Sequence, residues 1–183
     1  AVISGSLANQ VAIADNFSSV NAVTYNNMIN NGTVSLTGDG SVAIYANNGN
    51  ITNSSAVSAT GKESFGIYGE NGTVSTNTGT ITIGDQGVGI YGVSYQDPSN
   101  PGANGGGLIN ITNSGSIIGT GGSGTIGIYS NTNRTGGTKG DAVVTLSGGT
   151  INLGNVTEAI GVYVNKGTVN DTGSTITVGK NGI

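Results

Sequence analysis

Apolar and polar residues alternate in short runs that recur at a regular distance along the chain. A small residue, then Ile or Val, then Tyr occurs five times, ending at Tyr45, Tyr68, Tyr91, Tyr129 and Tyr163. Residues 45, 68 and 91 are 23 positions apart, whereas the next two steps, to 129 and to 163, are 38 and 34 positions. The pattern predicts a structural repeat of about 23 residues that is lengthened twice.

Two further apolar columns precede each tyrosine. The first lies ten to twelve residues earlier, at Val34, Val57, Ile81, Ile117, Ile151 and, as a sixth copy, Ile176. The second precedes the first by five to seven residues, at Met28, Ile51, Val74, Ile111, Leu146 and Val169. Runs this short and rich in β-branched residues cannot bury a face alone, so each must stack on the same run of the next repeat. We therefore predict an all-β parallel β-helix, a solenoid of about seven coils with three short strands per coil.

A column of asparagines supports the same repeat. Asn30, Asn53, Asn77 and Asn113 occupy equivalent places two residues before Gly or Ser, and Ser147 and Asp171 continue the column. Asn tolerates the left-handed backbone of a tight corner, and identical amides one coil apart can hydrogen-bond along the axis. These residues, together with Tyr45, Tyr68 and Tyr163, are predicted to form structural ladders.

Two neighbouring coils carry insertions at the same corner, near residues 92–107 and 130–141. Inserted loops on a rigid scaffold often bind ligands, although Gly-rich loops such as these can also be ornaments without a role. In the tyrosine strand, alternation predicts that Val88 and Ile90 point inward while Gly89 and Tyr91 point outward. The tyrosine column is then either a packing ladder or a platform for a sugar or peptide. The candidate ligand-binding residues are Tyr91, Tyr95, Asp97, Tyr129, Arg134 and Lys139.

Composition narrows the function classes. The chain of 183 residues has 35 Gly, only 8% charged residues and a formal net charge of −4. The few cations are scattered, so no basic stripe exists to follow a nucleic acid backbone, and nucleic acid is not an expected partner. The cations are Lys62, Arg134, Lys139, Lys166 and Lys180.

The usual catalytic side chains are scarce. His, Cys and Trp are absent, so the commonest general base, the thiolate nucleophile and the usual zinc ligands are missing. We expect no metal, no cofactor and no enzymatic activity. The alternative is a carbohydrate-active enzyme that works with carboxylates, for which Asp39, Glu63 and Asp85 occupy related loop positions in three successive coils.

The recurring phrases resemble a known family. Gly-Ile-Tyr-Gly occurs at residues 66–69 and 89–92, and it is joined to phrases such as Asn-Thr-Gly-Thr-Ile-Thr-Ile-Gly at 77–84. In this combination, over residues 25–183, the chain resembles the passenger domains of large fusobacterial, RadD-like type V autotransporter adhesins. The resemblance implies a right-handed β-helix exported to the bacterial outer surface and anchored in the outer membrane by a C-terminal barrel that is not in this sequence.

The resemblance also implies a function. Such passengers attach the cell to host cells or to other bacteria, so we expect a host or bacterial surface protein or glycan as partner and a monomeric chain. The alternative within the same family is a passive stalk that holds a distant binding tip. Residues 1–183 are predicted to be one β-helical segment, with 1–24 as an irregular first coil or cap. Because the repeat stops in mid-coil at Ile183, we expect a piece of a longer passenger.

Overall fold

The computed structural model describes residues 2–16, 27–94, 109–132 and 142–183, which form an all-β fold of three parallel sheets. Sheet A consists of β1 (Val2–Gly5), β4 (Thr33–Leu36), β7 (Ala56–Ala59), β10 (Thr80–Ile83), β13 (Ser116–Gly119), β16 (Thr150–Leu153) and β19 (Thr175–Val178). Sheet B consists of β2 (Val11–Asn16), β5 (Val42–Asn47), β8 (Phe65–Glu70), β11 (Val88–Ser94), β14 (Ile126–Thr132) and β17 (Ile160–Asn165). Sheet C consists of β3 (Asn27–Asn30), β6 (Asn50–Asn53), β9 (Val74–Asn77), β12 (Asn110–Asn113), β15 (Ala142–Leu146) and β18 (Gly167–Asp171).

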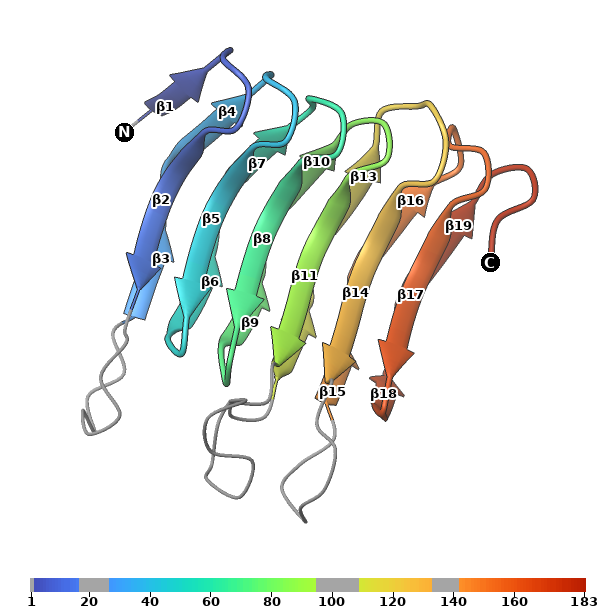
Figure 1. Cartoon of the computed structure of the whole chain (residues 1–183). Coiled ribbons are helices and arrows are strands. Elements are labelled where there is room, and N and C mark those ends of the chain that lie inside the picture. The colour runs from blue at the N-terminus through green and yellow to red at the C-terminus, as the bar shows by residue number, and fades with distance from the viewer. Residues whose placement is uncertain (1, 17–26, 95–108, 133–141) are drawn as a thin grey trace.

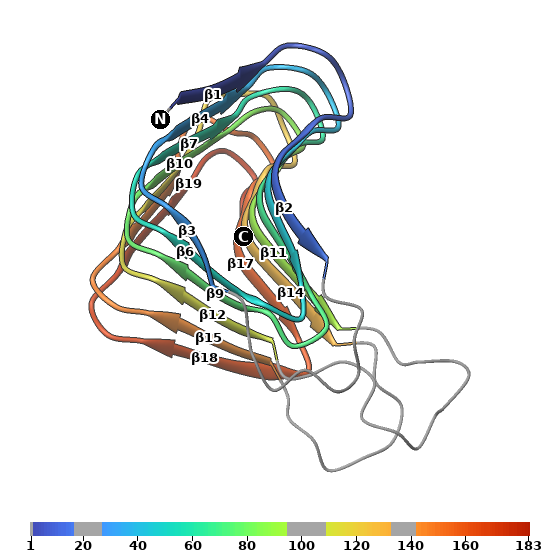
Figure 2. The same ribbon diagram turned by 90° about the vertical axis from the view of Figure 1, so that its left-hand side faces the viewer.

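Consecutive coils stack along one axis. Each strand pairs in parallel with the strands three before and three after it, so the three sheets run along a single solenoid (Figure 1). Viewed from the N-terminal end, the chain turns clockwise as it recedes, which makes the solenoid right-handed (Figure 2). The parallel β-helix with three strands per coil is thus confirmed. No helix in the described residues is long and apolar enough to cross a membrane.

Inward-facing aliphatic side chains form one continuous core. In sheet A the predicted column is in register in every coil, with Ile81 paired to Val57 on one side and to Ile117 on the other. Side chains in the middle of this column are at most 1% exposed. Burying one Ile or Val contributes about 2 kcal/mol, so repetition of this contact along the axis supplies most of the favourable free energy.

Sheet C differs from the prediction at two positions. Ser75, not Val74, pairs with Ile51 and Ile111, because the corner before β9 holds an extra residue, Gly72, that shifts the register by one. Leu146 pairs with Asn113 instead of Ile111. The asparagine column therefore continues into Leu146 and Asp171, and Ser147 does not belong to it.

The four predicted asparagines form a buried amide ladder. The Nδ2 atoms of Asn30, Asn53 and Asn77 each donate to the Oδ1 atom of the next asparagine, at 2.8, 2.8 and 2.7 Å, the last acceptor belonging to Asn113. Asn53, Asn77 and Asn113 are 0% exposed. None of the four has a left-handed backbone; Asn48 and Asn71, at the corners between sheets B and C, are among the residues that do.

The predicted first coil or cap, residues 1–24, contains two strands that follow the repeat. β1 pairs in register with β4, and β2 pairs with β5; residues 1 and 17–24 of this segment lie outside the described residues. The two predicted insertions also begin later than expected, because β11 continues to Ser94 and β14 continues to Thr132. Residues 17–26, 95–108 and 133–141 come directly after β2, β11 and β14 in the sequence and lie outside the described residues.

Candidate functional site

Five tyrosines form a continuous stack on the outer face of sheet B. Tyr45, Tyr68, Tyr91, Tyr129 and Tyr163 are paired in register from β5 to β17. Successive ring centroids are 5.7, 4.7, 5.0 and 4.9 Å apart, and the last two pairs are nearly parallel, at 4° and 13°. With centroids farther apart than two rings in direct face-to-face contact, the parallel rings are offset, which is the arrangement that aromatic quadrupoles favour.

The residues before each tyrosine do not alternate as predicted. A Cβ on Gly89 would lie 2.7 Å from Cγ2 of the core residue Ile117 and 2.5 Å from the carbonyl oxygen of Gly127, so Gly89 faces the core. Ile90 also belongs to the contiguous core, whereas Val88 is buried, at 8% exposed, but is not part of that core cluster. Two consecutive inward residues require the strand to depart from a regular pleat, and this bend interrupts the period-two alternation.

The bend places an apolar column beside the tyrosines. Phe65, three residues before Tyr68, packs edge-to-face on Tyr68 and Tyr91 with centroid distances of 5.3 Å. Its register partners are aliphatic in every neighbouring coil: Val42, Val88, Ile126 and Ile160. The sequence prediction missed this column because strict alternation placed Val88 on the inward face together with Ile90. The signal was present in the sequence as an apolar residue three positions before each of the five stacked tyrosines.

A more polar column follows the tyrosines at the far end of each strand. It consists of Asn47, Glu70, Val93, Asn131 and Asn165. The Tyr45 hydroxyl donates to Oε2 of Glu70 at 3.0 Å, and Nδ2 of Asn131 donates to the Tyr129 hydroxyl at 3.3 Å. We call these three columns together the tyrosine face. Across it, each coil presents an aliphatic group or Phe, then an aromatic ring, then in most coils a hydrogen-bonding group.

The other two sheets have a different exterior. The outward positions of β10 are Thr80 and Thr82, and those of β12 are Asn110 and Thr112, which alternate with fully buried residues. Their register partners in the neighbouring coils are mixed and include no aromatic residue: Ser58, Ser116, Thr76 and Thr145 are polar, and Ala56, Ile118, Val74 and Val143 are apolar. In Figure 2 the backbone of the sheet B strands also bows toward the solenoid axis. Sheet B therefore has an apolar inner face and an outer face on which two columns are apolar or aromatic and one is mostly polar, and a sheet that only contacts water does not need so many apolar residues on its outer face.

The structure brings together only part of the predicted binding set. Tyr91 and Tyr129 are neighbours in the stack, 5.0 Å between ring centroids. Tyr95, Asp97, Arg134 and Lys139 lie outside the described residues. Tyr45, Tyr68 and Tyr163, predicted as structural, are members of the same stack, so the tyrosine face is longer than the candidate site proposed from the sequence.

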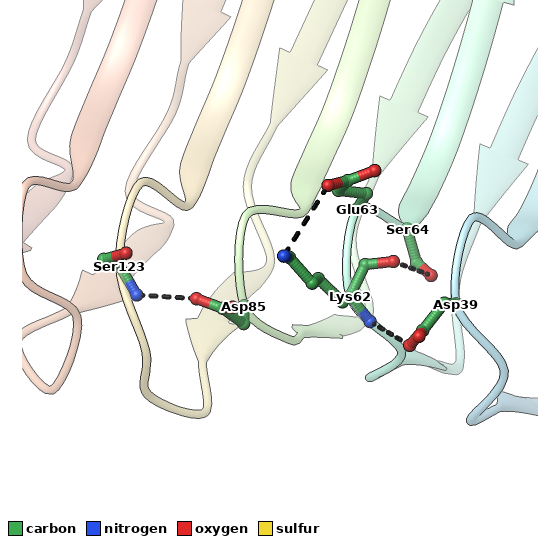
Figure 3. Close-up of polar contacts among 6 residues, drawn as sticks. All are labelled: Asp39, Lys62, Glu63, Ser64, Asp85 and Ser123. Carbon is green, nitrogen blue, oxygen red and sulfur yellow. Dashed lines mark hydrogen bonds and ion pairs between the residues drawn. The ribbon is translucent and has the colours of Figure 1, made fainter.

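The three candidate acids lie at the corner between sheets A and B (Figure 3). Oδ1 of Asp39 accepts the backbone N–H of Lys62 at 2.8 Å, and Oδ1 of Asp85 accepts that of Ser123 at 2.7 Å. Glu63 is one position further along, at a left-handed residue with φ of 57°, and its carboxylate is 3.9 Å from Nζ of Lys62. Two of the carboxylates thus tie one coil to the next, and none lies on a sheet face.

Asp171 accepts hydrogen bonds within its own corner. Hydrogen bonds from the side chain and backbone of Ser174 lower the pKa of the exposed Asp171. In the described part of the chain, no group of three or more His, Cys, Asp or Glu side chains is placed to hold a metal ion. The tyrosine face is therefore the feature of the described surface with the most distinctive chemistry.

Comparisons with protein-family models, curated proteins and solved structures found no match to this chain. Its function must therefore be inferred from its own sequence and geometry.

Proposed function

We propose that this chain is a non-enzymatic segment of a bacterial cell-surface autotransporter adhesin, and that the tyrosine face attaches the cell to host cells or to other bacteria. One observation supports this most directly: only sheet B, among the three described sheets, combines an apolar interior with an aromatic and aliphatic exterior. Contiguous apolar surface on a soluble protein commonly marks an interaction site. The Gly-Ile-Tyr-Gly phrases that resemble passenger domains lie within this same sheet.

The absence of a catalytic arrangement among the three candidate acids agrees with this proposal. A glycosidase needs two carboxyl groups that face a common substrate. Asp39 and Asp85 instead accept backbone N–H groups of the following coil, and Glu63 occupies a different position of the corner. Their arrangement serves the stacking of coils.

A passive stalk is the second candidate, and the ring contacts favour it. Rings that pack on one another shield the sheet and stiffen the solenoid whether or not a ligand binds. The two functions differ in what the isolated chain does. Beads coated with the chain should capture bacteria or host cells if it is an adhesive segment, and should capture no more than uncoated beads if it is a stalk.

A double variant locates the attachment surface. Tyr68→Thr combined with Tyr91→Thr removes two adjacent rings from the middle of the stack while keeping β-branched residues in the strands. We expect it to lose most bead attachment. Ile118→Ser is the matched control, because Ile118 is an exposed apolar residue, 37% exposed, on the outer face of sheet A. Equal loss in both variants, with both folded by circular dichroism, would contradict the assignment to the tyrosine face.

A further inference from the structure

We infer that the ligand of the tyrosine face is an uncharged, extended polysaccharide that lies along the solenoid axis, with about one sugar unit over each coil. This inference rests on the proposed function, since it names the chemistry that the attachment surface recognises. It is carried by three properties of the face: the spacing of its rings, the order of chemical groups across each coil, and its charge.

The spacing selects a ligand with its own short repeat. Ring centroids recur every 4.7–5.7 Å over five coils. An extended peptide presents side chains of one face about 6.7 Å apart, so it falls out of step within two coils. A pyranose unit in an extended, equatorially linked chain advances by about one coil spacing, so successive units meet successive rings.

The groups across each coil match the two sides of a sugar ring. Tyrosine has an apolar body with a polar tip, and here the tip points to an edge of hydrogen-bonding groups, as in the contacts of Tyr45 with Glu70 and of Asn131 with Tyr129. The C–H groups of a sugar can lie against the outer edges of the stacked rings while its hydroxyl groups meet the polar column beside them. An α-helix has a pitch of about 5.4 Å, which is close to the spacing of the rings. However, the side of a helix that would lie on the rings is apolar, so it would not form hydrogen bonds with the polar column of the tyrosine face.

Charge excludes acidic polysaccharides. None of the residues in the three columns is a cation, and Glu70 adds a negative charge beside the rings. The whole chain has a net charge of −4. A uronic acid or sulfated polymer would therefore be repelled and would find no counter-charge on the face, whereas a neutral polymer meets no penalty.

The test is a length series. Linear neutral oligosaccharides built from glucose, mannose, galactose or N-acetylglucosamine, from disaccharide to octasaccharide, are titrated into the chain by calorimetry. We expect at least one series to bind with an affinity that rises up to about five units, the number of stacked tyrosines, and then levels off. A carboxymethylated version of the same polymer should bind at least about tenfold more weakly.

A hydroxyl deletion separates recognition from packing. Tyr68→Phe with Tyr91→Phe keeps both rings in the stack, so we expect the chain to stay folded by circular dichroism and its affinity for the oligosaccharide to fall about fivefold. Thr112→Val, which removes a hydroxyl from the outer face of sheet C, should leave the affinity unchanged. Binding that is independent of oligosaccharide length, or a Phe variant with undiminished affinity, would overturn the inference.

The remaining outcomes separate this inference from the proposed function. If the Tyr→Thr variant loses cell attachment but no neutral oligosaccharide of any series binds, the polysaccharide is wrong and the adhesive face stands. Inhibition of cell attachment by an amphipathic helical peptide, and by no sugar, has the same meaning. If the unmodified chain attaches to no cell, the proposed function itself fails.

Discussion

At the scale of single residues, the buried amides are the side chains most sensitive to change. Asn53, which is 0% exposed, donates to Asn77 and accepts from Asn30 through buried bonds, and it also donates to the carbonyl of Ser55 through a part-buried bond. Asn53→Ala leaves a buried donor on one side and a buried acceptor on the other. We expect the free energy of unfolding to fall by about 3 kcal/mol, measured by urea denaturation.

Asn50 provides the control for this prediction, because it begins the same strand, β6, on the outer face. Its Nδ2 donates to Asn27 at 2.8 Å, but this bond is exposed and water can replace it. Asn50→Ala should therefore cost no more than about 0.5 kcal/mol. Similar decreases in the free energy of unfolding for the two variants would show that burial does not determine how much these amide hydrogen bonds stabilise the fold.

At the scale of the element, the bend in each strand of sheet B requires a small residue. A Cβ at Gly89 would lie 2.5 Å from the Gly127 carbonyl oxygen of the next coil, which is backbone and cannot move aside. Gly89→Ala should lower the free energy of unfolding by about 2 kcal/mol through overpacking. At Gly154 the nearest atoms, at 3.3 Å, are side-chain ends of Asn152 and Thr177, so Gly154→Ala should be nearly neutral. Thermal unfolding of both variants checks the difference.

The elements also show which parts of the fold follow from sequence. The predicted sheet A column is in register in every coil, because each copy is an Ile or Val that lies, in most coils, between polar residues. The tyrosine column is also in register, because tyrosine is rare elsewhere in the chain and identifies the equivalent position in each coil. Val74 was misplaced because a one-residue change in corner length is invisible to a pattern of apolar residues. The outward column of Phe65 and Val88 was missed because alternation assumes a regular pleat, and the bend at Gly66 and Gly89 breaks it.

At the scale of the whole molecule, stability should vary along the axis. Each coil contacts only the coils before and after it, so an inward side chain is buried as well as its neighbouring coils allow. Ile81 and Ile176 occupy the same inward column of sheet A, yet Ile81 is 0% exposed and Ile176 is 44% exposed. The difference arises from position along the solenoid, since residue type and face are the same.

This pair gives a direct measurement of the gradient in the 183-residue chain. Ile81→Ala empties a site that is enclosed on every side, so we expect it to lower the free energy of unfolding by about 3 kcal/mol. Ile176→Ala removes a side chain that already contacts water, and the expected loss is about 1 kcal/mol. Hydrogen exchange should show the same order, with amides of β10 better protected than those of β19. Equal losses and equal protection would mean that the coils unfold as one unit, and that nearest-neighbour stacking does not limit stability at the terminal coil.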